Sequence, residues 1–328
     1  MTEGSFVLET RVPATDRLEP LFVYDQDGEW PLHLALHAIP GGGVSLILDQ
    51  GACPLHQTVS YSDDGRTETL RVTYSWDALR RWGQLAVERP QDGKVITVPV
   101  RSPRPMRVID AKKLLRSGPG RFVSSHIDFM ALSAGIEPIG PMPSLVPSTP
   151  IATPDGFKRV ADLRRGDLVL TPEQEAVPVL HKVIRTVPAR GSFQPIRLRA
   201  PFFGLWQDID VSPSQRLLLS GSEVEYLFGQ QAVLLSTRHL TGTPRAYFPP
   251  TGLLATYVQV ILPRHEALNA AGTTTESLFV GRLRRNRDRL ERSLLNGIER
   301  NLIPEHGRPI HPVLRAFDAT ILAERRVA

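Results

Sequence analysis

The first hundred residues alternate between apolar and polar positions, as strands with one buried face do. In segment 32–38, three leucines alternate with two histidines and an alanine. The glycine-rich turn 40–43 follows, and segment 44–50 is again rich in apolar β-formers. Two such segments joined by a glycine-rich turn predict a β-hairpin.

Segment 67–77 repeats the alternation. Its apolar face would carry Leu70, Val72, Tyr74 and Trp76, and its polar face Arg71, Thr73 and Ser75. Segments 83–90 and 94–100 form another hairpin candidate around the turn 91–93. Alternation of period two, interrupted by turns every 8–12 residues or so, predicts an antiparallel β-sandwich or barrel.

A proline-rich stretch interrupts the chain after this region. Segment 106–118 is expected to form a short helix that ends at Gly118, and segment 127–135 a last strand. Five of the 15 residues in 136–150 are prolines, and proline is not tolerated inside a sheet. We therefore expect a sandwich over residues 1–135 and a linker over 136–143.

The chain beyond the linker is strand-rich up to residue 281, and then its character changes. Apolar residues in 282–300 follow a helical spacing, at Leu283, Leu290, Leu294, Leu295 and Ile298. The pattern predicts one amphipathic helix over 282–300 and a second helix over 309–325. The sequence as a whole predicts a mainly β protein with a C-terminal helical tail over 282–328.

The positive charge of the chain lies in this tail. Residues 282–328 hold eleven arginines and six acidic residues, which accounts for the whole net charge of +5. The arginines could form a solvated face over leucines that pack on the preceding domain, or they could bind nucleic acid or an anionic membrane. Segment 282–300 has no aromatic residue for base stacking, so nucleic acid is not the expected partner.

Composition limits the structural classes and the kinds of metal site that the chain can have. Apolar residues make up 41% of the 328 residues, enough for packed cores. Cys53 is the single cysteine, which excludes an internal disulfide and a cysteine-based metal cluster; we expect it to be a partly buried small residue. The first residues lack the basic start and apolar run of a signal peptide, and no apolar run is long enough for a membrane helix. The default compartment is then the cytoplasm, with non-classical export left open.

A series of short motifs runs from residue 144 to residue 281. It begins with a Pro-Ser-Thr turn, an Ile-Ala-Thr strand and a Gly-Asp pair, at 147–149, 151–153 and 166–167. It continues with DIDVSPSQR, TRHLTG and RHEALNAAGTTTESLFVG, at 208–216, 237–242 and 264–281. In this order and at this spacing the motifs resemble the Hint (hedgehog/intein) domain of bacterial proteins. The resemblance implies an all-β autoprocessing fold over residues 144–281.

The same resemblance assigns roles to individual residues. The first residue of such a domain attacks the preceding carbonyl and converts an amide into a thioester or ester. Ser144 holds that position, where cysteine is typical, and the scissile bond would be Pro143–Ser144. Ser212 opens the motif whose fourth residue is the proton-donating histidine, but Gln215 stands there, and Gln259 replaces a second frequent histidine. An amide cannot deliver a proton at pH 7.

Two functional interpretations follow. In the first, the Hint domain has a degenerate centre and is a non-catalytic scaffold, joined to a sandwich that serves recognition. In the second, the chain cleaves itself at Pro143–Ser144 by an N-to-O acyl shift. Ser144 would be the nucleophile, and Thr153, Gln215 or His239 would polarise the scissile amide. Any enzymatic activity would then be intramolecular autoproteolysis of the protein-splicing type.

Other polar residues of the second half have simpler interpretations. His239 either lines the former active site or is a hydrogen-bonded core or turn histidine. His265 and Glu266, with Glu276, could form a polar cluster; the HExxH zinc motif is incomplete because Asn269 replaces its second histidine. No metal site and no bound cofactor are predicted there. Residues 165–167 match an integrin-binding string, but we expect the aspartate to fix a turn.

The first half resembles the concanavalin A/laminin-G type of β-sandwich. The resemblance rests on its strand pattern and on the hairpin sequence LRVTYSWDALRRWGQLAVERP, at 70–90. It implies an unidentified protein or glycan as the partner. The acidic turns 25–28 and 63–65 are turn signals first, and calcium ligands as the alternative.

Overall fold

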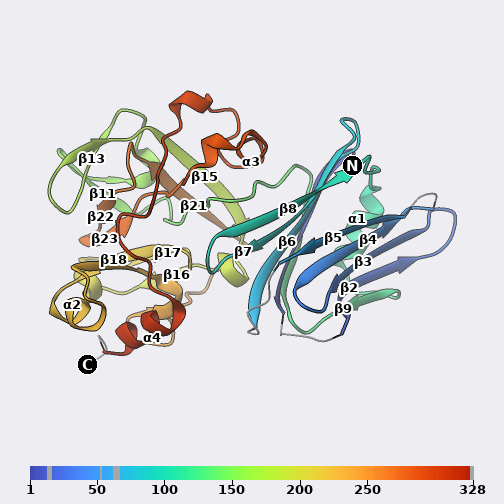
Figure 1. Cartoon of the computed structure of the whole chain (residues 1–328), viewed down its shortest axis with the longest axis horizontal. Coiled ribbons are helices and arrows are strands. Elements are labelled where there is room, and N and C mark those ends of the chain that lie inside the picture. The colour runs from blue at the N-terminus through green and yellow to red at the C-terminus, as the bar shows by residue number, and fades with distance from the viewer. Residues whose placement is uncertain (13–16, 52–53, 62–66, 326–328) are drawn as a thin grey trace. The chain divides into compact units, whose positions relative to one another are not determined.

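A computed structural model describes residues 1–12, 17–51, 54–61 and 67–325 of the chain. The chain divides into two compact units, Met1–Gly140 and Pro141–Ala328, and the division falls inside the proline-rich stretch. Both units are built mainly from antiparallel strands (Figure 1). The acidic turn expected at 63–65, with its alternative role as a calcium site, and the expected partial burial of Cys53 lie outside the described residues. No helix within the described ranges is long and apolar enough to cross a membrane.

The first unit is a sandwich of two five-stranded sheets. One sheet has the order β10-β1-β6-β7-β8 and the other the order β5-β4-β3-β2-β9. The strands of the first sheet are β1 (Glu3–Val12), β6 (Glu68–Asp77), β7 (Trp82–Arg89), β8 (Lys94–Arg101) and β10 (Ile127–Ser133). Those of the second are β2 (Glu19–Gln26), β3 (Leu32–Ala38), β4 (Gly43–Asp49), β5 (Leu55–Ser60) and β9 (Arg121–Val123).

These strands confirm the alternation seen in the sequence. Both predicted hairpins form, β3 with β4 and β7 with β8, and the expected helix is α1 (Val108–Leu115). The apolar faces of the two sheets meet in one core, in which Tyr74 and Trp76 are among the largest fully buried side chains. Gly4 of β1 packs flat on this core, because a Cβ there would lie 2.6 Å from the ring of Trp76.

The opposite face of β6 is also buried, which the sequence did not indicate. Arg71 lies between two buried carboxylates, with its Nε 3.3 Å from Glu9 and its Nη1 3.6 Å from Glu88. The segment that leaves the sandwich is fastened to this face. Ser5 Oγ accepts from the Glu137 N–H at 2.8 Å, and Glu88 Oε1 accepts from the Gly140 N–H at 3.0 Å. The polar face therefore holds the chain just before the second unit begins.

The second unit contains a six-stranded sheet and three smaller ones. The large sheet has the order β12-β11-β22-β23-β18-β19, and β13 pairs β14, β15 pairs β21, and β16 lies between β17 and β20. Its strands are β11 (Pro150–Thr153), β12 (Gly156–Arg159), β18 (Arg216–Ser220), β19 (Ala232–Ser236), β22 (Ala267–Ala270) and β23 (Thr273–Glu276). The others are β13 (Leu168–Leu170), β14 (Ala176–Pro178), β15 (His181–Pro188), β16 (Ile196–Leu198), β17 (Ile209–Val211), β20 (Ala246–Tyr247) and β21 (Leu254–Ile261). Helix α2 (Ser222–Phe228) connects β18 to β19.

The prediction of one helix over 282–300 is wrong. The segment forms the 3-10 turn η5 (Leu283–Arg285), the short helix α3 (Arg287–Glu291) and a series of turns before η6 (Arg300–Leu302). Asn286 interrupts the helical run, since its side chain caps the start of α3 by accepting from the Arg289 N–H. Leu290 and Leu295 nevertheless pack on the strands of the second unit, so the apolar spacing reports burial rather than a continuous helix.

The second predicted helix is shorter than expected. It is α4 (Ala316–Arg325), and the residues before it are extended beside β19. The Leu234 N–H donates to the Pro312 carbonyl at 2.8 Å, and the Leu314 N–H donates to the Leu234 carbonyl at 2.9 Å. Three residues of α4 then enter the main core of the unit. The tail is thus an integral part of this fold.

Candidate functional site

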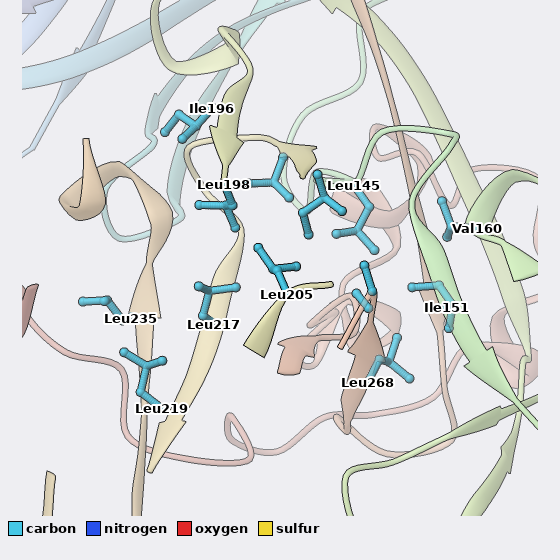
Figure 2. Packing of buried hydrophobic residues seen from close by; sticks show 14 of the residues in the cluster. Leu145, Ile151, Val160, Ile196, Leu198, Leu205, Leu217, Leu219, Leu235 and Leu268 are labelled. Carbon is cyan, nitrogen blue, oxygen red and sulfur yellow. The ribbon is translucent and has the colours of Figure 1, made fainter. Parts of the chain in front are cut away.

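The chain enters the second unit through a buried strand-like segment at Ser144 and Leu145. Leu145 bridges to Val211 and Val258, and it exchanges two backbone hydrogen bonds with Val258, at 2.7 and 3.2 Å. Figure 2 shows its side chain among the buried hydrophobic residues of the main core of the unit. The segment at Ser144 and Leu145 is therefore fixed by backbone pairing with two strands and by packing of the Leu145 side chain in the core.

Leu145→Ala is expected to destabilise the second unit by about 2–5 kcal/mol, because it removes a fully buried side chain and leaves a cavity. Leu145 is 0% exposed. Urea unfolding of the full chain, followed by circular dichroism, measures the effect. Leu253→Ala is a matched control, since Leu253 is 82% exposed in the same unit and should change stability by less than about 0.5 kcal/mol. Equal effects of the two substitutions would contradict the anchoring role of Leu145.

The Ser144 hydroxyl is hydrogen-bonded to a side-chain amide and not to a titratable group. Its hydroxyl donates to Gln215 Oε1 at 2.5 Å, and both side chains are buried. The Gln215 Nε2 donates to the Arg216 carbonyl at 2.9 Å and more weakly, at 3.4 Å, to the Glu276 carbonyl. With its nitrogen bound to carbonyls, the amide turns its oxygen to the serine and can only accept.

Gln259 completes the amide pair. Its Nε2 donates to the Glu276 carbonyl at 2.7 Å and lies 3.4 Å from Gln215 Oε1. Within the described residues, Gln259 Oε1 has no hydrogen-bond partner although it is buried. The structure thus brings Ser144, Gln215 and Gln259 together, as the family motif implied, but through neutral groups.

Ser212 supports the site from the backbone. Its N–H donates to the Ser144 carbonyl at 2.7 Å, and its carbonyl accepts from the Gln215 N–H at 2.9 Å. Thr237, which the sequence did not single out, donates its hydroxyl to the same carbonyl at 2.9 Å. The Thr237 N–H also donates to the Gln215 carbonyl, so this threonine stabilises the turn that carries Gln215 through two hydrogen bonds. Its only sequence signal was its place at the start of TRHLTG.

Thr153 and His239 do not join this group through any described hydrogen bond. The Thr153 hydroxyl donates to the Gly156 carbonyl at 2.5 Å and closes the hairpin between β11 and β12. Burial, with Arg238 beside it, lowers the pKa of His239 to about 4. His239 is therefore neutral at pH 7 and has no proton to supply as an imidazolium.

His265 fastens the tail to the domain. Its Nδ1 accepts from the Ile310 N–H at 3.0 Å, which places the proton on Nε2, 3.2 Å from the Ser277 carbonyl and 3.3 Å from Glu276 Oε2. Glu266 contributes through its backbone N–H, which donates to Ser277 Oγ, and burial raises the pKa of its carboxyl. Within the part of the chain that the structure describes, no three His, Cys, Asp or Glu side chains gather as metal ligands.

A second buried histidine was not singled out from the sequence. His306 Nδ1 accepts from the Val280 N–H at 3.2 Å, and its Nε2 donates to the Leu262 carbonyl at 3.2 Å. Burial, the largest effect, lowers its pKa, and His265 adds to the lowering. No local motif in the sequence distinguishes His306 from a surface histidine.

Because the pKa values of His239 and His306 are lowered in the folded chain, we expect the second unit to lose stability in acid. A folded-state pKa below the unfolded value of about 6.5 means that unfolding takes up protons. Stability is therefore fully present above pH 6.5 and is lost as pH falls toward the folded pKa, which for His239 is about 4. We expect His239→Asn to flatten the dependence of the melting temperature on pH between 7.5 and 5. His126→Asn, at a half-exposed histidine of the first unit, should leave the slope as in the wild type, and equal slopes in all three proteins would contradict this prediction.

The Pro143 carbonyl is the group that an acyl shift to Ser144 would require. Pro143 is buried, and among the described residues no donor is hydrogen-bonded to its carbonyl oxygen. Among the described residues, the hydrogen bond of the Ser144 side chain goes to the Gln215 amide and to no titratable group. The expectation that Asp167 fixes a turn at 165–167 agrees with its hydrogen bond, because its carboxylate accepts from the Arg164 N–H at 3.0 Å.

Comparison with known proteins finds a family match within the second unit. A family model described as Hint domain matches residues 143–282. Among solved structures, the MchDnaB-1 intein is 12% identical, with a TM-score of 0.28 over 40% of this chain and 98% of its own. The Msm DnaB1 intein splicing domain is 16% identical, with a TM-score of 0.27 and the same coverage. The LG1-3 region of the laminin alpha2 chain is 11% identical, with a TM-score of 0.29 over 84% of this chain and 53% of its own. No curated protein matches the chain.

Proposed function

We propose that the second unit, in which residues 143–282 match the Hint domain model, is a non-catalytic scaffold and that the β-sandwich before it is a recognition module. One observation carries the proposal. The hydroxyl in the nucleophile position donates its hydrogen bond to the side-chain amide of Gln215, and that amide stands where the family has its proton-donating histidine.

An N-to-O acyl shift at Pro143–Ser144 requires proton transfers that the amide of Gln215 cannot perform. In an N-to-O shift, Ser144 Oγ bonds to the Pro143 carbonyl carbon, the C–N bond breaks, and the hydroxyl proton must reach the leaving nitrogen. Gln215 can accept the hydroxyl hydrogen bond but cannot take or give a proton near pH 7. A serine hydroxyl is also a weak nucleophile unless a base activates it. Each missing acid or base costs about 10²–10⁴-fold in rate.

The test is the covalent integrity of the chain after synthesis. We expect a chain tagged at both ends and expressed in bacteria to give one band that carries both tags, identical to that of Ser144→Ala. Two bands that meet at Pro143–Ser144 and disappear in Ser144→Ala would overturn the scaffold and establish the self-cleaving alternative.

The partner of the sandwich is proposed to be a protein or a glycan. A calcium-dependent glycan module is the variant that can be tested most simply. Of the described acidic segment 25–28, Asp25 lies in β2, and its Oδ1 is 2.5 Å from His33 Nδ1, so this carboxylate already has a protein partner. We expect millimolar calcium, compared with chelator, to leave the melting temperature unchanged. A clear rise would favour the calcium-binding module, since a ligand of the native state raises stability.

A further inference from the structure

A hollow of about 730 Å³ in the C-terminal extension is lined by three arginines. Arg284 and Arg285 come from η5, and Arg300 comes from η6, two short turns that both contribute to the lining of the hollow. Glu299, Asn301 and Glu305 complete the lining. The hollow lies within the second unit and apart from Ser144 and its amide partners in sequence.

Glu305 holds two of the guanidinium groups in fixed positions. Its Oε1 accepts from Arg284 Nε at 2.7 Å, and its Oε2 accepts from Arg285 Nη2 at 2.6 Å. These bonds, that of Arg285 first, lower the pKa of Glu305 to about 2. The carboxylate is therefore ionised at physiological pH and pre-orients both arginines.

Donor groups remain after these internal bonds are made. Arg300 is held through its Nε, which donates to the Arg284 carbonyl, and neither of its terminal nitrogens has a partner among the described residues. The same holds for Nη2 of Arg284 and Nη1 of Arg285. Three guanidinium groups that line one solvent-open hollow thus keep N–H groups that no described residue accepts.

The charge around the hollow favours an anion. Three guanidinium groups face two carboxylates, of which Glu305 is already bound to arginines. The surrounding segment 282–300 contains seven arginines against three acidic residues. The local field is therefore positive, in a chain whose first 281 residues carry no net charge.

We propose that this hollow binds a phosphate-bearing ligand. Planar guanidinium forks match the oxygens of a phosphate group in pairs, and a fixed fork loses less freedom on binding than a mobile one. The volume exceeds what one phosphate fills and lies within the ordinary range of small-molecule sites. Within the lining there is no aromatic side chain, so recognition is through the phosphate and not through a stacked base.

The full-length chain is tested against both sources of such a group. Pyrophosphate is titrated by calorimetry at low salt, and vesicles of phosphatidylcholine, with and without phosphatidic acid, are tested by co-sedimentation. Binding to pyrophosphate alone identifies a soluble ligand, and binding to phosphatidic acid vesicles as well identifies a lipid headgroup. Binding of neither, or equal binding of succinate, overturns the proposal.

Variants locate the binding. Arg300→Ala should weaken binding by about 10- to 100-fold, the effect of losing a hydrogen bond to a charged group, and Arg300→Lys should restore it only in part. Arg289→Ala, an exposed arginine of α3 outside the lining, is the matched control and should bind as the wild type does. Unchanged binding by Arg300→Ala, in a protein that melts like the wild type, would overturn the assignment to this hollow.

Discussion

Ser144→Cys combined with Gln215→His is expected to turn a stable chain into one that cleaves at Pro143–Ser144. The double change supplies a partly ionised thiol in place of a hydroxyl, and an imidazole, the usual group for proton transfer near neutrality, in place of an amide. Gln215 lies within hydrogen-bond reach of Ser144 Oγ, at 2.5 Å, so the imidazole would replace an existing contact. The gain should be at least about 10²–10⁴-fold in the rate of fragment formation with thiol present.

Three controls separate this outcome from unspecific hydrolysis. Ser144→Ala with Gln215→His should stay whole, because it has the acid but no nucleophile. Ser144→Cys alone should be far slower than the double variant, since its leaving nitrogen still lacks a donor. The wild type in the same thiol controls for Cys53. A double variant that melts like the wild type and yet stays whole would show that the lost activity has another cause than these two groups.

Arg71→Ala is expected to destabilise the sandwich by about 3–5 kcal/mol. The substitution leaves the Glu9 and Glu88 carboxylates, whose side chains are 0% and 7% exposed, without the guanidinium between them. Breaking a buried ion pair from one side costs this much because the remaining charge stays desolvated. Trp76 in the core of the same unit reports unfolding by fluorescence during urea titration.

An exposed ion pair of the same sandwich is the control. Arg80 lies 3.4 Å from Asp77, and its side chain is 83% exposed. Arg80→Ala should therefore cost less than about 1 kcal/mol. If Arg71→Ala were as mild as Arg80→Ala, the buried carboxylates would have to find other partners, and the polar face would not depend on Arg71.

Local sequence patterns predicted the strands better than they predicted the tail. Alternation of period two is a direct consequence of strand geometry, and β3, β4, β7 and β8 formed where it occurred. In the tail, apolar spacing was compatible with one helix, but Asn286 caps a new start inside it. The burial of Leu290 and Leu295 comes from strands far away in sequence, which periodicity does not reveal.

Only the residues that belong to the family motif could be placed in the site from the sequence. The motif placed Ser144 and Gln215 in one centre, and the structure puts them in direct contact. The Glu276 carbonyl, which binds both amides, and the Thr237 hydroxyl beneath Ser212 are contributions from backbone positions and distant strands. Such contacts follow from the assembled fold, and residue type alone carries no sign of them.

The acyl shift itself, rather than the cleavage that follows it, is the most direct measure of whether the centre is silent. The purified wild-type chain is held for hours at neutral pH with hydroxylamine, which traps an ester as a hydroxamate, and its intact mass is followed beside that of Ser144→Ala. We predict one unchanged mass for both proteins, because no group at Ser144 can move the proton. A fragment of residues 1–143 that ends in a Pro143 hydroxamate, seen in the wild type and absent in Ser144→Ala, would contradict the account.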